Sequence, residues 1–236
     1  MIDRRRLLGS TAAAATLSLA PASAQVSAAE VGAAANGWFA LTSDDEKPVP
    51  NLRVPVELSE DVEDLQGAVW GGPASASVTL VEFYDYNCPW CRGANADRAA
   101  LMRADPDLRV GLVNNPILSP GSAQAAKVEL AVLRLKGAGA AYALHEHLFG
   151  APGRIDGPRA LDAAVALGFD RAETERVADG SDVRGTLGRQ MRLAASIGLS
   201  ATPSYVVGGA ALLGYPGPAT MRRVVANTRL CGNVTC

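Results

Sequence analysis

The sequence predicts an α/β fold in which a block of helices is inserted into a βαβ…ββα frame. Three observations predict this arrangement. A run of β-branched and aromatic residues at 78–86 precedes a helical stretch at 92–103 and a strand-like run at 108–113, which is the order of a parallel βαβ unit. Helical patterns then fill residues 119–197. Strand character returns only at 204–207, so the helical block lies inside the frame.

The ends of these elements carry their own signals. Asp105-Pro106 ends the first helix, because the residue before a proline disfavours helical backbone. Gly208-Gly209 predicts a hairpin turn into a returning strand, and a closing helix follows over 218–228. About five helices are expected in the inserted block, over 128–135, 142–149, 158–167, 170–178 and 183–197.

Residues 25–70 have few core signals and an excess of acidic side chains. Pro48, Pro50 and Pro55 interrupt any helix there. We therefore expect an acidic, partly extended arm, with the folded domain beginning near Gly71. The predicted organisation is a signal peptide at 1–24, the arm at 25–70, the frame at 71–118 and 198–230, the inserted helices at 119–197 and a cysteine-containing tail at 231–236.

The first 24 residues have the composition of a cleavable export signal. Arg4-Arg5-Arg6 precede an apolar run at 7–20, and Ala22-Ser23-Ala24 provides a small-residue cleavage site. The arginines favour the twin-arginine route over the general secretory route. The alternative is an uncleaved anchor, but the run is short for a membrane span. We expect a periplasmic protein with no stable membrane insertion after cleavage.

Composition narrows the class of protein. The 236 residues are 48% hydrophobic and carry a formal net charge of −2. Such a chain can bury a core, but it lacks the basic surface that nucleic-acid binding requires. The four cysteines, all in the exported part, are Cys88, Cys91, Cys231 and Cys236. An even number of cysteines in an oxidising compartment favours disulfides over free thiols or zinc.

The dithiol Cys88-Pro89-Trp90-Cys91 directly follows the first predicted strand and begins the helix. A thiolate at the first cysteine lies beside unpaired backbone N–H groups and the positive end of the helix dipole, and both lower its pKa. We therefore expect Cys88 to be exposed and to attack, and Cys91 to resolve. Glu82 lies six residues before Cys88 in a predicted buried strand, where an unpaired carboxylate has a raised pKa.

Three separated motifs support a family resemblance. They are the segment from Val81 to Cys91, the helical insertion, and Ala201-Thr202-Pro203-Ser204-Tyr205-Val206-Val207-Gly208-Gly209. In this order they resemble the DsbA-like branch of the thioredoxin superfamily, over about residues 70–230. The resemblance implies a thioredoxin fold with an inserted helical domain, and the activity of a protein thiol–disulfide oxidoreductase. It implies no cofactor beyond the redox-active Cys88–Cys91 disulfide.

The resemblance also implies roles for single residues. Glu82 matches the family's buried acid beneath the dithiol, which helps to move protons to or from Cys91. Pro203 matches a cis-proline that faces the dithiol, and Thr202 precedes it. A cis bond there turns the Thr202 amide toward an extended substrate strand, which can pair with this edge. Plainer alternatives are a salt-bridged strand residue for Glu82 and a trans edge-strand proline for Pro203.

Pro89 and Trp90 complete the expected substrate-binding surface. Strongly oxidising relatives carry histidine where Trp90 stands, so a hydrogen-bond donor or positive charge near the Cys88 thiolate is lost. Trp90 therefore leaves the oxidising strength open, and it either offers an apolar face to substrate or shields the disulfide. Asp85 and Asn87 are expected in solvent-facing turn roles, with tuning of the site as the alternative.

Two further pairs of residues raise separate questions. Cys231 and Cys236 are expected to form a structural disulfide; a redox relay to the dithiol and a crosslink to a partner are the alternatives. His145 and His147 are two residues apart on a helix and point to different faces, so no metal site is expected there.

Three functions follow from these features. The first is an oxidase that introduces disulfides into unfolded or reduced exported polypeptides, through a mixed disulfide at Cys88, and is reoxidised by a membrane redox partner. The second is an isomerase or reductase with the opposite electron flow. The third is a copper or zinc carrier that binds through Cys88 and Cys91. The glutathione-dependent isomerase branch of the same fold normally lacks both the dithiol and an export signal.

Overall fold

The structure is a computed structural model that describes residues 38–236. The predicted signal peptide and the first part of the predicted arm, residues 1–37, lie outside the described residues. The strands are β1 (Asn51–Arg53), β2 (Val69–Gly71), β3 (Val78–Tyr84), β4 (Leu108–Asn114), β5 (Ser204–Val207) and β6 (Ala210–Leu213). The helices are α2 (Val56–Glu63), α3 (Pro89–Ala104), α4 (Pro120–Lys136), α5 (Ala138–Gly150), α6 (Gly157–Ala166), α7 (Arg171–Ala178), α8 (Ser181–Ile197) and α9 (Pro218–Cys231).

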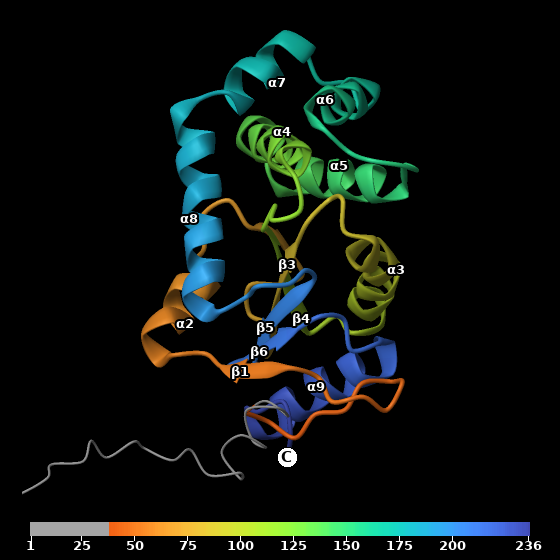
Figure 1. Cartoon of the computed structure of the whole chain (residues 1–236), viewed down its shortest axis with the longest axis vertical. Coiled ribbons are helices and arrows are strands. Elements are labelled where there is room, and N and C mark those ends of the chain that lie inside the picture. The colour runs from red at the N-terminus through yellow and green to blue at the C-terminus, as the bar shows by residue number, and fades with distance from the viewer. Residues whose placement is uncertain (1–37) are drawn as a thin grey trace, which may run out of the picture.

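The strands form one mixed sheet in the order β1-β6-β5-β3-β4-β2. β3 and β4 are parallel and α3 connects them, whereas β5 pairs antiparallel with β3 and with β6. The β5–β6 turn is at Gly208-Gly209, where both residues have positive φ angles that favour glycine. This is the βαβ…ββα frame that the sequence predicts, and β3 lies at its centre with both neighbours paired (Figure 1).

The folded region begins earlier than the predicted boundary near Gly71, so that boundary is wrong. β1 pairs with β6 at one edge of the sheet, and β2 pairs with β4 at the other. Val54, Val62 and Leu65 from this segment are buried in the core on one face of the sheet. The acidic side chains of α2 point outward, because its only buried residue is Val62. The excess of acidic residues in this segment predicted an arm, but its few apolar residues pack in the core.

The inserted block consists of α4 to α8; α4 to α7 gather at one end of the sheet in Figure 1, and α8 runs from there alongside the sheet to α2. α4 is the central helix and contacts the other four. Its buried residues are mostly small or branched: Ser122, Ala125, Ala126, Val128, Glu129, Leu130, Ala131 and Val132. Small side chains let neighbouring helices approach closely, which accounts for the alanine-rich composition of this block.

The chain ends in a disulfide between Cys231 and Cys236. The short loop it closes holds Val234 in the core, fully buried. Arg229, two residues before Cys231, donates to Ser77 at 2.9 Å, and Ser77 directly precedes β3. The dithiol follows the other end of β3, so the two cysteine pairs lie at opposite ends of that strand.

Replacing both cysteines of this pair by serine (Cys231→Ser with Cys236→Ser) is expected to lower the free energy of unfolding by about 2 kcal/mol, because the closed loop is short. Thiol-exchange rates at the dithiol are expected to stay at the wild-type value. Urea unfolding of the oxidised double variant measures the first quantity, and reduction kinetics measure the second. A large loss of exchange rate in a folded double variant would instead indicate a relay between the pairs.

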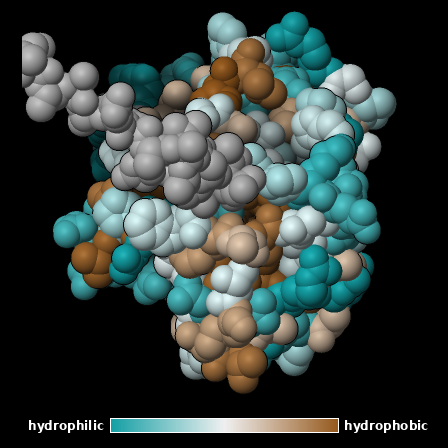
Figure 2. All heavy atoms as spheres, turned by 60° about the horizontal axis from the view of Figure 1, so that its bottom comes forward, coloured by the Kyte–Doolittle hydropathy of each residue, from teal (hydrophilic) through white to brown (hydrophobic). Residues whose placement is uncertain are grey.

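The surface of the described part of the chain is mixed in character. Figure 2 shows the face at the lower end of Figure 1, where apolar side chains are interspersed with hydrophilic ones. Within residues 38–236, no helix combines the length and apolar character needed to cross a membrane.

Candidate active site

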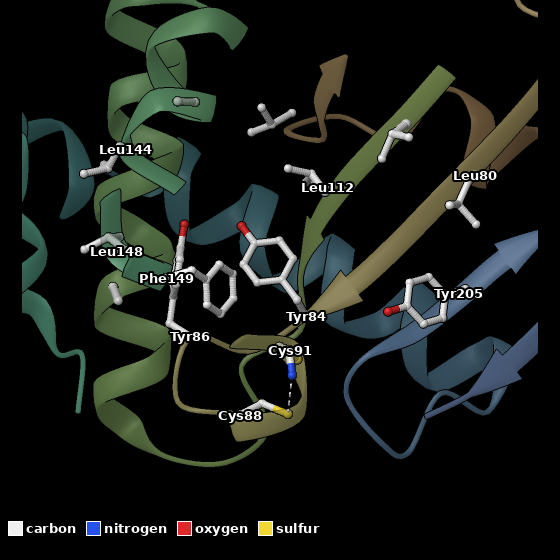
Figure 3. Packing of buried hydrophobic residues seen from close by; sticks show 14 of the residues in the cluster. Leu80, Tyr84, Tyr86, Cys88, Cys91, Leu112, Leu144, Leu148, Phe149 and Tyr205 are labelled. Carbon is white, nitrogen blue, oxygen red and sulfur yellow. Dashed lines mark hydrogen bonds between the residues drawn. The ribbon is translucent and has the colours of Figure 1, made fainter. Parts of the chain in front are cut away.

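Cys88 occupies the N-cap position of α3, directly after the loop that leaves β3. Its backbone is extended, with φ −82° and ψ 119°, and its sulfur accepts a hydrogen bond from the Cys91 N–H at 3.3 Å (Figure 3). Pro89 begins the helix, where its fixed φ fits and its missing N–H leaves no donor unpaired. The sulfur of Cys88 therefore serves as the cap of the helix, a position that favours negative charge.

The two thiols differ sharply in acidity. The pKa of Cys88 is lowered from 9.0 to about 6, chiefly by a hydrogen bond from the Cys91 thiol, and burial opposes the shift. Hydrogen bonds from Thr202 and from the backbone at Cys91 and Trp90 lower it further. Burial raises the pKa of Cys91 far above its ordinary range. At neutral pH the reduced site therefore holds a thiolate at Cys88 and a protonated thiol at Cys91.

The expectation that Cys88 is exposed is wrong, because only 3% of its surface is accessible. The segment before β5 covers it: the Cys88 thiol lies 3.1 Å from the backbone oxygen of Thr202. The Thr202–Pro203 peptide bond is cis, as the family resemblance implies. Trp90 is 72% exposed beside the covered sulfur. The structure thus brings Cys88, Thr202 and Pro203 together, and it leaves Trp90 open to solvent.

Glu82 lies on β3 beneath the dithiol and is buried, but it is not alone. Arg98 of α3, also buried, places its Nε 3.2 Å from Glu82 Oε2. Burial raises the pKa of Glu82 to about 7; the Arg98 charge opposes the rise, and the Cys88 thiolate and Glu146 add to it. Glu82 is therefore both a buried acid and a member of an ion pair. The sequence offered these two descriptions as alternatives.

Asp85 and Asn87 do not have the solvent-facing roles expected for them. Asp85 is buried, and its carboxylate accepts hydrogen bonds from the Asn87 N–H at 2.7 Å and the Leu118 N–H at 2.9 Å. The Asn87 side chain exchanges two hydrogen bonds with the backbone of Ile155, at 2.7 and 2.8 Å. These contacts fix the loop before Cys88 against the segment between β4 and α4 and the segment between α5 and α6.

A buried polar cluster beside the dithiol was not predicted. Glu129 of α4 accepts hydrogen bonds from the Tyr84 hydroxyl and, at 2.6 Å, from Asn114. Nδ1 of His145 lies 3.3 Å from Glu129 and 3.4 Å from the Tyr86 hydroxyl. The tyrosine rings pack with Phe149 next to the dithiol (Figure 3). One signal for the cluster existed in the sequence, a single glutamate within the apolar face of a helix, but its partners come from three other elements.

Burial alone would raise the pKa of Glu129, but hydrogen bonds from His145, Tyr84 and Asn114 outweigh it and lower the pKa. Burial lowers the pKa of His145 and so favours the neutral imidazole. The cluster therefore holds one buried carboxylate, satisfied by three donors, at the junction between the sheet and the insertion. Nowhere in residues 38–236 do three or more His, Cys, Asp or Glu side chains form a group that could hold a metal ion.

The comparison with known protein families agrees with the geometry of this site. The family model described as the DSBA-like thioredoxin domain matches residues 79–226, which span the dithiol, the insertion and the cis-proline. The chain belongs to this DSBA-like family. The predicted fold class, family and enzyme class are therefore confirmed, since DSBA-like proteins are thiol–disulfide oxidoreductases. No curated protein sequence matches the chain.

Solved structures agree with the family assignment. A thioredoxin-like oxidoreductase from Silicibacter pomeroyi DSS-3 is 32% identical, with a TM-score of 0.68, and the match covers 73% of this chain and 98% of that one. The thiol-disulfide exchange protein alpha-DsbA2 from Wolbachia pipientis is 22% identical, with a TM-score of 0.67, over 72% and 91% of the two chains. The catalytic domain of Proteus mirabilis ScsC is 24% identical, with a TM-score of 0.63, over 73% and 96%.

The low pKa of Cys88 predicts how this DSBA-like protein responds to pH. The Cys88 thiol has a pKa of 9.0 in the unfolded protein and of about 6 in the folded protein. The thiolate therefore stabilises the reduced fold. That contribution is complete above about pH 9 and is lost as the pH falls toward 6. The thiolate absorbance of the reduced protein is expected to titrate with a midpoint near 6.

The control for this prediction is the Cys88→Ser variant, in which the low-pH titration step is expected to disappear. The difference in unfolding free energy between reduced wild type and this variant should grow as the pH rises through the same interval. Because the Cys88 thiolate raises the pKa of Glu82, the free-energy difference also contains this coupling, and it is the loss of the absorbance step that isolates Cys88. A thiolate midpoint above 8 would contradict the prediction.

Proposed function

We propose that this protein is an exported oxidase that introduces disulfides into reduced polypeptides. The observation that carries the proposal is the N-cap thiolate of Cys88 beside a Cys91 thiol that stays protonated. A stabilised thiolate favours the reduced dithiol, and a dithiol that is stable when reduced makes an oxidising disulfide. Each tenfold change in that equilibrium corresponds to about 30 mV.

The proposed reaction begins with the Cys88–Cys91 disulfide. A substrate thiolate attacks the sulfur of Cys88, a substrate–Cys88 bond forms, and the Cys88–Cys91 bond breaks. Cys91 leaves as a thiolate and takes a proton. A second substrate thiolate then attacks the substrate sulfur of the mixed disulfide, and Cys88 leaves as its stable thiolate. The substrate loses two electrons, which the dithiol gains and passes to a membrane redox partner.

The surroundings of Cys88 suit an unfolded polypeptide as substrate. The residue before the cis-proline, Thr202, lies against the sulfur and precedes strand β5. Trp90, Ile117 and Leu118 are large apolar side chains exposed to solvent by 72%, 42% and 52%. The Leu118 N–H donates to Asp85, so the segment that carries Ile117 and Leu118 lies against the loop before Cys88. An extended segment with apolar side chains could bind here by backbone pairing and by apolar contact.

The proposed location is the periplasm. It depends on the basic, apolar and small-residue pattern of residues 1–24, which lie outside the described residues. An oxidising compartment also suits the Cys231–Cys236 disulfide. Cell fractionation of the tagged full-length chain tests the location, with the Arg4→Lys/Arg5→Lys variant as a test of the twin-arginine route.

A redox titration against glutathione tests the oxidase. The oxidase proposal expects a potential well above the value of about −270 mV that is typical of thioredoxin. Oxidation of a reduced, unfolded multi-cysteine protein should be fast, and repair of a scrambled one slow. A potential near that of thioredoxin would contradict the oxidase and favour a reductase. Fast repair of the scrambled protein would favour an isomerase. Tight stoichiometric copper or zinc that blocks both thiols would favour the carrier.

A further inference from the structure

The two residues that flank the dithiol motif, Asn87 and Arg92, both bind one segment of the insertion. This segment, residues 149–156, comprises the end of α5 and the loop that leads to α6, and it is called here the α5–α6 segment. On one side of the motif, the Asn87 side chain exchanges two hydrogen bonds with the backbone of Ile155, at 2.7 and 2.8 Å. On the other side, Arg92 donates to backbone oxygens of the same segment.

Arg92 contacts three backbone oxygens in this segment. Its Nη1 donates to the oxygen of Phe149 and, at 2.6 Å, to that of Ala151, and its Nη2 lies 3.5 Å from the oxygen of Gly153. The last carbonyl groups of a helix have no partner within the helix, and a cation is favourable at that end. One side chain from the first turns of α3 therefore closes the end of α5, which lies above α3 in Figure 1.

The α5–α6 segment has a fixed path of its own. Phe149 and Ile155 are buried in the same core cluster as the two cysteines of the dithiol, and Phe149 lies beside the dithiol in Figure 3. Asp156 caps α6, because its side chain accepts a hydrogen bond from a backbone N–H of the first turn at 3.1 Å. Asn87 and Arg92 bind backbone atoms of the segment, so its path determines where both residues are held.

The first turn of α3 has little support from its own side chains. Its cap is the Cys88 sulfur, and no acidic residue lies in the turn. A thiolate is a strong acceptor for the free N–H groups of this turn, whereas a disulfide sulfur carries no charge and accepts weakly. In the proposed reaction, Cys88 is part of a disulfide both in the oxidised protein and in the mixed disulfide. The cap is therefore weakest in the states from which the thiolate has to leave.

We propose that the α5–α6 segment acts as a brace that holds both ends of the dithiol, with Asn87 and Arg92 as positioning residues that keep the Cys88 sulfur at the start of α3 in every redox state. The proposal rests on the proposed thiol–disulfide exchange at Cys88. When the thiolate leaves the mixed disulfide, it finds the Cys91 N–H in place, at the 3.3 Å of the reduced protein. Donors that are already in place stabilise a new charge without reorganisation.

The first test measures the acidity of Cys88 in the reduced full-length protein by thiolate absorbance across pH. Arg92→Met and Asn87→Ala are each expected to raise the midpoint from near 6 by about one pH unit, because the first turn frays and the thiolate loses donors. Glu82 of β3 also titrates beside Cys88, but its carboxyl group has no thiolate absorbance. The equilibrium constant with glutathione at pH 8 should change about tenfold, which makes the disulfide less oxidising by about 30 mV.

Three further variants separate the brace from the charge of Arg92. Arg92→Lys keeps the charge but not the planar fork that reaches several carbonyls, so its midpoint should rise with that of Arg92→Met. The combined Asn87→Ala and Arg92→Met variant should shift little further than either alone, because both residues hold one segment. Arg103→Met, which removes an exposed cation from the last turn of α3, should leave the midpoint unchanged.

A substitution within the segment tests the brace without changing a residue next to the motif. Ile155→Ala removes a fully buried side chain and loosens the backbone that Asn87 binds, so the midpoint should rise again. The matched control is Leu130→Ala, which removes a buried side chain from a different cluster of the insertion. It should lower the stability to urea in a similar way and leave the midpoint of Cys88 at the wild-type value.

The outcomes separate the brace from the proposed function. A wild-type midpoint in folded Arg92→Met or in folded Ile155→Ala overturns the brace, and the exchange activity stands. Full restoration by Arg92→Lys, or shifts that add in full in the combined variant, also overturns it. Should Arg92→Met not fold, Asn87→Ala and Ile155→Ala decide the question. If the oxidised wild type does not react with glutathione at all, the exchange activity fails, and the titrations still report on the brace.

Discussion

Replacing Cys88 by serine is expected to reduce disulfide transfer to the uncatalysed rate. Both proposed steps pass through this sulfur: it is attacked in the oxidised protein, and it leaves as a thiolate when the mixed disulfide resolves. A serine oxygen cannot form the disulfide, and Cys91 is too deeply buried to replace Cys88, since none of its surface is accessible. The measurement is oxidation of a reduced model polypeptide by the preoxidised protein.

The matched variant is Cys91→Ser, which keeps the attacking sulfur and removes only the resolving one. Reduced Cys91→Ser protein is expected to attack a disulfide substrate through Cys88, release one substrate thiol and accumulate as the mixed disulfide. Mass spectrometry under acid quench detects that adduct. An adduct on Cys91 in the Cys88→Ser variant, at a comparable rate, would reverse the assignment of the two roles.

Replacing Glu129 by alanine is expected to destabilise the protein by about 3–5 kcal/mol, the range for losing one partner of a buried charged cluster. The substitution leaves the Tyr84 hydroxyl, the Asn114 amide and His145 without their common acceptor. It also leaves a cavity in α4, the central helix of the insertion. Urea unfolding of the oxidised protein at neutral pH measures the loss.

Two control variants define this effect. Glu129→Gln keeps the shape and one acceptor oxygen, so a smaller loss is expected than for alanine. Glu175→Ala removes an exposed glutamate from α7 of the same block and is expected to change stability by no more than about 0.5 kcal/mol. Equal losses for Glu129→Ala and Glu175→Ala would show that the buried cluster contributes little to folding.

Much of the fold could be predicted because its elements carry local signals. The strand before the dithiol is a continuous run of β-branched and aromatic residues, and β3 is central and buried, as such a run indicates. Proline and glycine mark the ends of the inserted helices. Residues 38–70 lacked such signals, because β1 and β2 have three residues each and are defined by the strands that they pair with.

The candidate site likewise contains residues that the sequence predicted and residues that it did not. Cys88 and Cys91 were identified from their spacing, whereas Glu82 and Pro203 were identified from the resemblance of their motifs to the DsbA-like family. Arg98 and Glu129 were not, since a single charged residue on a helix gives no sign of the strand it faces. The burial of Cys88 was also missed, because it depends on Thr202, which is 114 residues away in the sequence. Contacts between segments that are distant in the sequence determine the partners of Arg98 and Glu129 and the burial of Cys88. Such contacts cannot be predicted from the local patterns of a single sequence.

The two short strands at the sheet edges decide how a shortened form of the protein would behave. A core cut out at the start of the family match, residue 79, would lack β1 and β2 and leave the backbone of β6 and β4 open. Open strand edges recruit other chains, and aggregation follows. The segment that carries β1 and β2 therefore covers two strand edges that would otherwise promote self-association. Any fragment made for crystallisation or engineering needs to keep this segment.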